Sequence, residues 1–197
     1  MSAVASPAGA ITPDRAGGNH WQQAAETMSI EELRDTQMER LRGTLRRAVD
    51  NVPFYRHRLD EVGLAPDDVT CHGDACDLPF TTKIDLRDHY PFGMFAVPRD
   101  GLVRVHASSG TTGNPTTVGY TAGDVSLWAD LIARTLAAGG MQPGDMLQNA
   151  YGYGLFTGGL GLHGGCERLG AIILPISGGN TDRQLKLMRD FGVTALS

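Results

Sequence analysis

The sequence predicts an α/β protein in which a parallel βαβ sheet flanked by helices follows a helical segment. Up to about residue 100, apolar side chains recur at helical spacing, whereas from residue 101 onward short apolar strands alternate with amphipathic helices. Glycine, at 26 of 197 residues, is concentrated in that second part. We therefore divide the chain into a disordered tail (1–28), a helical N-terminal segment (29–100) and an α/β region (101–197).

The first part of the chain contains a tail and a long helix. Residues 1–20 are rich in Ala, Gly, Pro and Ser and show no periodicity, which is typical of disorder. Ser29 and Glu32 have the spacing of a capping box, in which each side chain bonds the backbone N–H of the other. The apolar stripe that follows predicts a helix to about Asn51.

Two shorter helices follow. Pro53 is placed to start one that ends near Gly63, because proline is favoured in the first helical turn and glycine at the end. A loop is expected over 74–79. Thr82 then caps a helix that ends before Pro91.

The second part begins with two short strands joined by a glycine-containing loop. The alternation in 102–106 predicts a strand, and 117–120 predicts a second one, so the chain makes a hairpin-like return. The remaining elements predict a parallel sheet covered by helices. They are a helix from Thr121 to Gly139–Gly140, strand 146–150, helix 157–169, strand 171–176, a helix capped by Thr181 that ends at Phe191, and strand 193–196.

Composition excludes several classes of protein. The net charge of -5 provides no basic footprint for nucleic acid. Four arginines share a helix with several acids, which favours a solvated helix face; they are Arg40, Arg42, Arg46 and Arg47. No apolar stretch approaches the ~18–20 residues of a membrane span.

The three cysteines favour a reducing compartment. They are an odd number, no secretory signal accompanies them, and we expect a cytoplasmic protein. Cys71, His72 and Cys76 suggest a zinc site, but a fourth ligand and a paired knuckle are missing. We therefore predict no metal site in the chain.

The strongest chemical motif is the loop Ser108–Pro115, with the sequence Ser-Ser-Gly-Thr-Thr-Gly-Asn-Pro. Its glycines, Gly110 and Gly113, allow tight turns that expose backbone N–H groups to an anion. Four hydroxyls add further donors, from Ser108, Ser109, Thr111 and Thr112. The alternative is a polar hairpin turn, since the same residue types populate turns generally. A Walker loop is disfavoured, because no Gly-Lys followed by Ser or Thr occurs.

A second glycine pattern competes for a nucleotide. Gly159, Gly161 and Gly164 match the dinucleotide fingerprint, which would make the protein an NAD-binding oxidoreductase. However, the first glycine lies well beyond the preceding strand, and no acid closes the next strand to bind a ribose. Tight packing of small residues explains these glycines better. His163, nearby, has no nucleophile motif and is interpreted as a packed histidine.

Aromatic residues separated by glycines follow the predicted strand 146–150. Ligands bind beyond the carboxyl ends of parallel strands, where Tyr151, Tyr153 and Phe156 can wall a flat apolar pocket. Simple core packing is the alternative for each ring.

Several of these strings coincide with one family. The loop Ser108–Pro115 resembles the phosphate loop of the adenylate-forming superfamily of acyl-CoA synthetases. Further strings in order resemble phenylacetate–CoA ligases more narrowly; they are Asn51–Tyr55, Leu78–Lys83, Tyr90–Gly93, Asn149–Gly159 and Ser177–Gly179.

The resemblance implies an acid–thiol ligase of phenylacetate catabolism, with ATP and CoA as co-substrates, Mg²⁺ with the ATP and an aryl carboxylic acid as substrate. Ser108, Ser109, Gly110, Thr111, Thr112 and Gly113 would bind the phosphates, and Tyr151 and Phe156 would line the aryl pocket. The resemblance also implies a homodimer. In this family Lys usually occupies the position of Asn114, so one phosphate-facing charge is missing. The family also usually has Tyr and Ala where this chain has Gly164 and Gly165.

The chain ends inside a predicted strand, before the family's later nucleotide motifs and the mobile domain that carries the adenylation lysine. We therefore expect a fragment with no assignable catalytic residue and no ligase activity by itself. The alternative is a non-catalytic nucleotide- or acyl-binding remnant that acts as a partner protein.

Overall fold

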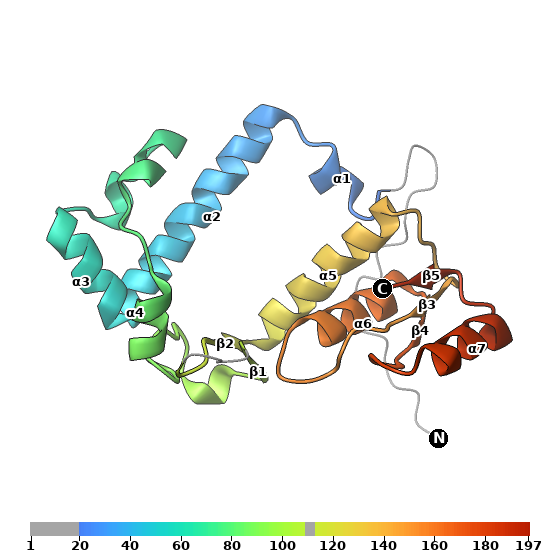
Figure 1. Cartoon of the computed structure of the whole chain (residues 1–197). Coiled ribbons are helices and arrows are strands. Elements are labelled where there is room, and N and C mark those ends of the chain that lie inside the picture. Colours follow the sequence, from blue (N-terminus) through green and yellow to red (C-terminus); the bar gives the residue numbers. More distant parts are fainter. Residues whose placement is uncertain (1–19, 109–112) are drawn as a thin grey trace, which may run out of the picture. The chain divides into compact units, whose positions relative to one another are not determined.

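The computed structural model describes residues 20–108 and 113–197. They form two compact units, and the boundary between them falls inside a helix. One unit comprises 28–126 and 153–157; the other comprises 20–27, 127–152 and 158–197. Figure 1 labels the elements of both. The three-part division proposed from the sequence runs in chain order, whereas each of these units is discontinuous.

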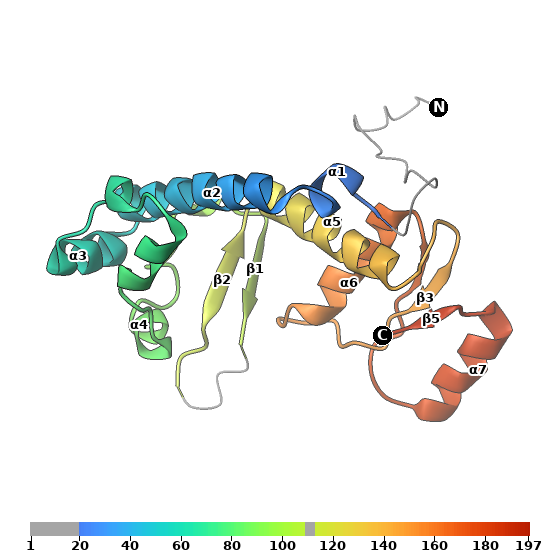
Figure 2. The same cartoon turned by 90° about the horizontal axis from the view of Figure 1, so that it is seen from above.

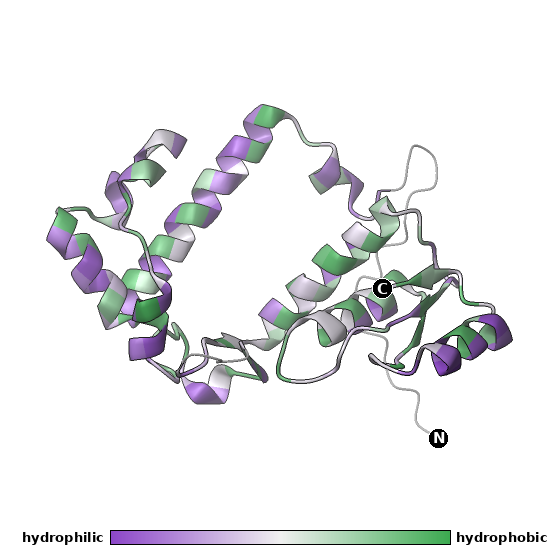
Figure 3. Ribbon diagram, in the orientation of Figure 1, coloured by the Kyte–Doolittle hydropathy of each residue, from purple (hydrophilic) through white to green (hydrophobic). Residues whose placement is uncertain are grey.

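The unit built around 28–126 begins with three helices, α2 (Ile30–Asn51), α3 (Pro53–Val62) and α4 (Lys83–Asp88). The predicted capping boxes are confirmed: the Ser29 hydroxyl accepts from the Glu32 N–H at 3.2 Å, and Thr82 does the same for Asp85 at 3.3 Å. Two short 3-10 turns connect α3 to α4, at Pro66–Asp68 and His72–Asp77, and a third, at Arg99–Gly101, precedes the first strand. Most of α2 is hydrophilic, as Figure 3 shows.

Two of the four arginines of α2 are engaged rather than only solvated. Arg42 donates from Nε to the Val69 carbonyl at 2.9 Å and from Nη2 to the Thr70 carbonyl at 3.0 Å. Arg46 pairs with Asp67. Val69 is buried, so these bonds satisfy backbone oxygens of the loop that packs against the helix. The sequence pattern could not indicate these contacts, because the acceptors, two backbone carbonyls and the Asp67 carboxylate, lie in another segment of the chain.

The same unit contains the predicted hairpin. Strands β1 (Arg104–Ala107) and β2 (Thr117–Tyr120) pair antiparallel, from Arg104 opposite Tyr120 to Ala107 opposite Thr117. Figure 2 shows the two strands side by side.

The second unit is a parallel three-stranded sheet with helices on both faces, which confirms the predicted fold class. The strand order is β4–β3–β5, and both pairings of the central strand are parallel. Its elements are α1 (Gln23–Glu26), most of α5 (Ala122–Ala138), β3 (Met146–Gln148), α6 (Gly158–Leu169), β4 (Ile172–Leu174), α7 (Thr181–Phe191) and β5 (Ala195–Leu196). The cap of α7 is Asn180, whose side chain accepts from the Arg183 N–H at 3.0 Å, and not Thr181, which is the first helical residue.

Successive residues of β3 point to opposite faces of this sheet. Leu147 belongs to the core cluster that contains Ala133 of α5 and Cys166 of α6. Gln148 instead donates to the side chain of Gln184 on α7, at 3.2 Å. Helices α5 and α6 therefore cover one face and α7 the other.

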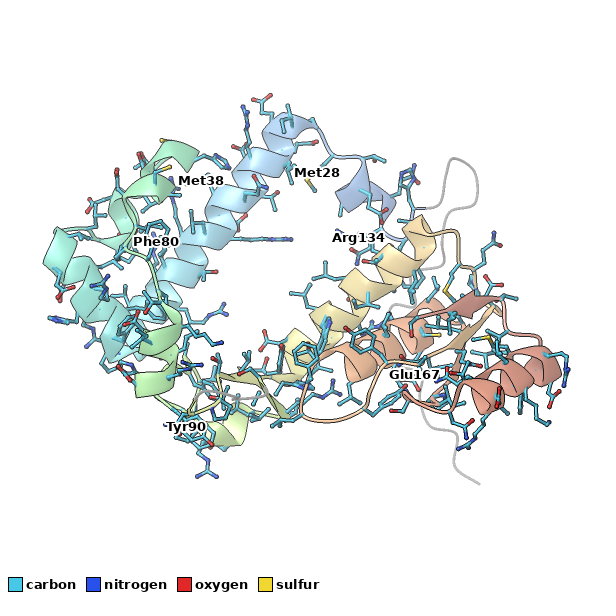
Figure 4. The ribbon with its side chains drawn as sticks, in the orientation of Figure 1. Met28, Met38, Phe80, Tyr90, Arg134 and Glu167 are labelled. Carbon is cyan, nitrogen blue, oxygen red and sulfur yellow. The ribbon has the colours of Figure 1, made fainter. Side chains whose placement is uncertain are left out.

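The core also includes a residue from the range predicted as tail. Trp21 is buried in the same cluster, and α1 follows it directly. Arg134 on α5, labelled in Figure 4, pairs with Glu26 at 3.6 Å and bonds Gln22. Residues 20–27 are thus part of a folded unit, because the buried Trp21 indole anchors them in its core. Within residues 20–108 and 113–197, no helix has the length and apolar character that crossing a membrane requires.

Candidate functional site

The base of the predicted phosphate loop is closed by two hydrogen bonds. The Ser108 N–H donates to the Thr116 carbonyl at 2.9 Å, and the Thr116 N–H donates to the Ser108 hydroxyl oxygen at 3.0 Å. A hydroxyl that accepts in this way still carries a hydrogen that it can donate. Gly113 has a φ of +114°, which only glycine adopts without strain. Ser109, Gly110, Thr111 and Thr112 lie outside the described residues.

The strand that leads into this loop is tied to the aromatic segment. The Leu155 carbonyl accepts from the Ala107 N–H at 3.0 Å and from His106 Nδ1 at 2.9 Å. Since a carbonyl can only accept, Nδ1 carries the hydrogen. His106 is 2% exposed, and its ring packs edge-on against Tyr120. The bonds hold Phe156, the residue after Leu155, close to Ser108, the residue after Ala107.

The two predicted pocket residues are both partly exposed. Phe156 is 58% exposed and lies in the same unit as Ser108, while Tyr151 is 49% exposed and lies in the unit that contains the parallel sheet. Both rings are too exposed to be core residues, and core packing was the alternative interpretation for each of them. The structure therefore brings Phe156 to the base of the loop and places Tyr151 at the carboxyl edge of the sheet, directly after β3.

Two polar residues that organise these segments were not predicted. His106 was noted only as part of a strand, and Asn149 only as part of a motif. Asn149 is fully buried at the end of β3. A polar residue next to a buried strand, just before a glycine-rich segment, is the signal that could have found it, because buried amides are retained when they are hydrogen-bonded.

The second glycine pattern lies inside α6 and packs against α5. A Cβ on Gly161 would lie 2.4 Å from the Trp128 ring, and one on Gly165 would lie 2.1 Å from Cγ2 of Ile132. Close approach of α5 therefore accounts for Gly161 and for the neighbouring Gly165, and a Cβ on Gly159 would lie 2.5 Å from the Gly152 carbonyl oxygen. Tight packing thus explains Gly159 and Gly161 of the pattern, whereas Gly164 makes only an ordinary contact. His163 and Glu167, on the same helix, pair at 3.2 Å; Glu167 is labelled in Figure 4.

The Cys71 region is organised by a carboxylate. Asp74 accepts from the N–H groups of Cys71 and Thr70, at 2.8 and 2.7 Å, and these bonds lower the pKa of Asp74 to about 2. The Cys71 thiol donates to the same carboxylate, while His72 Nε2 bonds Gln37 at 3.1 Å. Among the residues that the structure describes, no three His, Cys, Asp or Glu side chains gather as metal ligands would.

Comparison with known proteins identifies the family. The chain is 57% identical over 166 residues to a phenylacetate–coenzyme A ligase of Pseudomonas putida, a match that covers 84% of this chain and 38% of that protein. The corresponding ligase of Thermus thermophilus is 55% identical over 177 residues, with 90% of this chain and 40% of the relative covered. This chain belongs to the phenylacetate–coenzyme A ligase family. It spans about 40% of the length of the curated relatives that it matches.

Solved structures of another CoA ligase share the fold of this chain. A 2-hydroxyisobutyryl-CoA ligase in complex with 2-HIB-AMP and CoA matches with a TM-score of 0.88 and 29% identity over 95% of this chain and 41% of that one. An open conformation of the same ligase, also with 2-HIB-AMP and CoA, gives a TM-score of 0.86 at 28% identity, covering 95% of this chain and 45% of that one. No protein-family model matches the chain. The α/β architecture is therefore that of part of an adenylate-forming ligase.

Proposed function

We propose that the protein is an ATP-dependent phenylacetate–CoA ligase and that this chain supplies its phosphate loop and part of its aryl pocket. In the first step, a carboxylate oxygen of the aryl acid attacks the α-phosphorus of ATP, and the bond to pyrophosphate breaks. In the second step, the thiol of CoA loses its proton and attacks the acyl carbon, which releases AMP and gives the thioester. This proposal rests on the curated relatives, which carry that name at 55–57% identity.

The Leu155 carbonyl is the structural observation that supports it. By accepting from both His106 and Ala107, it fixes the aromatic segment to the strand that enters the phosphate loop. A carboxylate and a phosphate react faster when both groups are held in place beforehand, because the entropic cost of bringing them together is then paid on binding and not in the transition state. A phosphate loop attached directly to an aryl-binding segment meets that requirement.

The proposed roles follow from chemistry. Ser108, Ser109, Thr111 and Thr112 donate hydroxyl bonds to the phosphates, and Gly110 and Gly113 expose backbone N–H groups to them. Tyr151 and Phe156 contact the aryl ring. Mg²⁺ accompanies the ATP, held mainly by phosphate oxygens and water, as is usual for this ion. A cytoplasmic homodimer completes the proposal.

An ATP–pyrophosphate exchange assay with a panel of aryl acids tests it, on the protein as its native reading frame encodes it. We expect exchange that depends on phenylacetate and falls in Ser108→Ala. Thr135→Ala is the matched control, since its hydroxyl donates only to the Leu131 carbonyl of its own helix. Exchange that is absent with every acid would contradict the proposal.

Calorimetric titration separates the other candidates. Binding of ATP without any exchange would support the non-catalytic nucleotide-binding protein instead. Binding of NAD in preference to ATP would support a dinucleotide site, although Gly161 of that pattern packs against Trp128.

A further inference from the structure

Asn149 joins three segments through its side chain. Its Nδ2 donates to the Gly159 carbonyl in the first turn of α6, at 2.8 Å. Its Oδ1 accepts from the Tyr151 N–H at 3.1 Å and from the Ser197 hydroxyl at 3.0 Å. The side chain has no exposed surface, so no solvent competes for these bonds.

The backbone of Asn149 joins the neighbouring strand as well. Its N–H donates to the Leu174 carbonyl at 2.9 Å, and its carbonyl accepts from the Ser177 N–H at 3.0 Å. These two bonds extend the β3–β4 pairing by one residue and do not involve the side chain. They therefore provide an internal reference for any experiment on the amide.

Asn149 also lies where the strand order reverses. From β3 the chain crosses to β4 on one side, and from β4 it returns past β3 to β5 on the other side. The carboxyl ends of β3 and β5 consequently flank the point at which the covering helices diverge, which is where open α/β sheets bind ligands. The bond from Ser197 to Asn149 spans those two strand ends.

We propose that Asn149 is the positioning residue of the aryl pocket, which fixes Tyr151 and the start of α6 at this point. Asparagine supplies a donor and an acceptor on one short side chain, whereas an ionised aspartate only accepts and an alanine does neither. The Tyr151 ring lies against Gly158, whose Cβ, if present, would be 2.4 Å from Cε1 of the ring. The hydrogen bond of the Tyr151 N–H and this contact together fix the position of the Tyr151 ring. The inference rests on the proposed function for the identity of the ligand.

Amide hydrogen exchange measured by NMR tests the positioning role without any ligand. In Asn149→Ala we expect the Tyr151 amide to exchange roughly tenfold faster, because it loses its acceptor. The Ser177 amide, which bonds the Asn149 backbone carbonyl, stays protected. An unchanged Tyr151 rate overturns the inference. Should Asn149→Ala not fold, Asn149→Ser, which keeps an oxygen at reduced reach, is measured in the same way.

Phenylacetate affinity as a function of pH tests the functional part. In Asn149→Asp the buried carboxylate repels the Gly159 carbonyl oxygen, because both groups can only accept hydrogen bonds. Burial also raises the pKa of this carboxylate. We expect weak binding near pH 8 that recovers roughly tenfold towards pH 6 as the protonated acid donates to Gly159, while the wild-type affinity stays flat. Asn51→Asp is the control, since Asn51 makes an exposed bond to the Arg47 carbonyl.

The outcomes are distinct. A flat profile in Asn149→Asp, or wild-type affinity in Asn149→Ala despite fast Tyr151 exchange, overturns the role of Asn149 in the pocket. A wild-type protein that binds no phenylacetate overturns the proposed function, and the exchange rates then still decide whether Asn149 holds Tyr151.

Discussion

Two glycine-rich stretches of this chain use the same residue for opposite physical purposes. In the loop that ends at Pro115, Gly113 has a φ of +114°, and apart from its chain neighbours no atom of the described residues lies within 4 Å of the position where a Cβ would stand. In α6, Gly161 and Gly165 have ordinary helical backbones, but a Cβ on either would overlap α5. One stretch needs conformational freedom beside open space, and the other needs the absence of a side chain.

The difference teaches how a glycine motif should be interpreted. Both stretches match nucleotide-binding patterns in the sequence. Spacing already disfavours the pattern in α6, and the surroundings of the missing Cβ supply the physical reason. Open space around a left-handed glycine is compatible with an incoming ligand. A helix or ring already in that space leaves no room for one.

The largest expected effect comes from filling the packed stretch. Gly165→Val places a branched side chain into Ile132, and we expect the free energy of unfolding to fall by about 3 kcal/mol. Gly164→Ala is the matched control, because its Cβ would lie 3.8 Å from Ala129, an ordinary contact. That control should be neutral or gain up to about 1 kcal/mol from helix propensity. Urea unfolding measures both, and equal midpoints would show that α6 can shift away from α5.

A smaller effect is expected in the loop. Gly113→Val forces an L side chain into the left-handed region, with strain of about 1–2 kcal/mol and no clash. We expect weaker ATP binding by calorimetry at nearly unchanged stability, since the loop can relax where α6 cannot. A loss of stability as large as that of Gly165→Val would contradict the contrast between the two stretches.

The next effect concerns ATP affinity and the charge at position 114 of the loop. Asn114→Lys restores the positive charge that the family usually carries, and we expect ATP to bind roughly two- to fivefold more tightly at low salt, which is at most about 1 kcal/mol. The gain should shrink as salt is added, because exposed charges are screened. Asn114→Gln controls for side-chain length. An unchanged KM for ATP and an unchanged rate in Asn114→Lys would remove this residue from the phosphate site.

The packed stretch also has a pH dependence. Burial, and secondarily the Glu167 charge, raises the pKa of the Cys166 thiol to about 11 from an ordinary value of 9.0. A raised folded-state pKa stabilises the protein below the unfolded pKa, and this contribution is lost as pH rises from about 9 to about 11. The urea midpoint should therefore fall over that window. Cys166→Ala, which cannot titrate, should show a shallower fall; identical slopes would contradict the burial of this thiol.

Sequence patterns predicted the helices well where local chemistry decides them. The Ser29 and Thr82 caps form as expected, because a capping box involves only residues three apart. Strand β2 has the predicted bounds, whereas the strands of the parallel sheet are shorter than predicted: β3 ends at Gln148 and β4 at Leu174. Asn149 and Ser177 still pair through their backbones beyond the carboxyl ends of β3 and β4, so backbone pairing continues past the regular strands.

By itself the sequence determined the α/β class, the hairpin and the family, because alternating strands and helices and a string of local motifs are written in neighbouring residues. Only the tertiary structure decided that Leu155 ties the aromatic segment to β1, that Asn149 gathers Tyr151, Gly159 and Ser197, and that α5 fills the space over the glycines of α6. Each of these contacts joins residues that are distant in sequence or bonds backbone atoms common to every residue. No local pattern records such pairings, since they depend on how the packed elements bring atoms together.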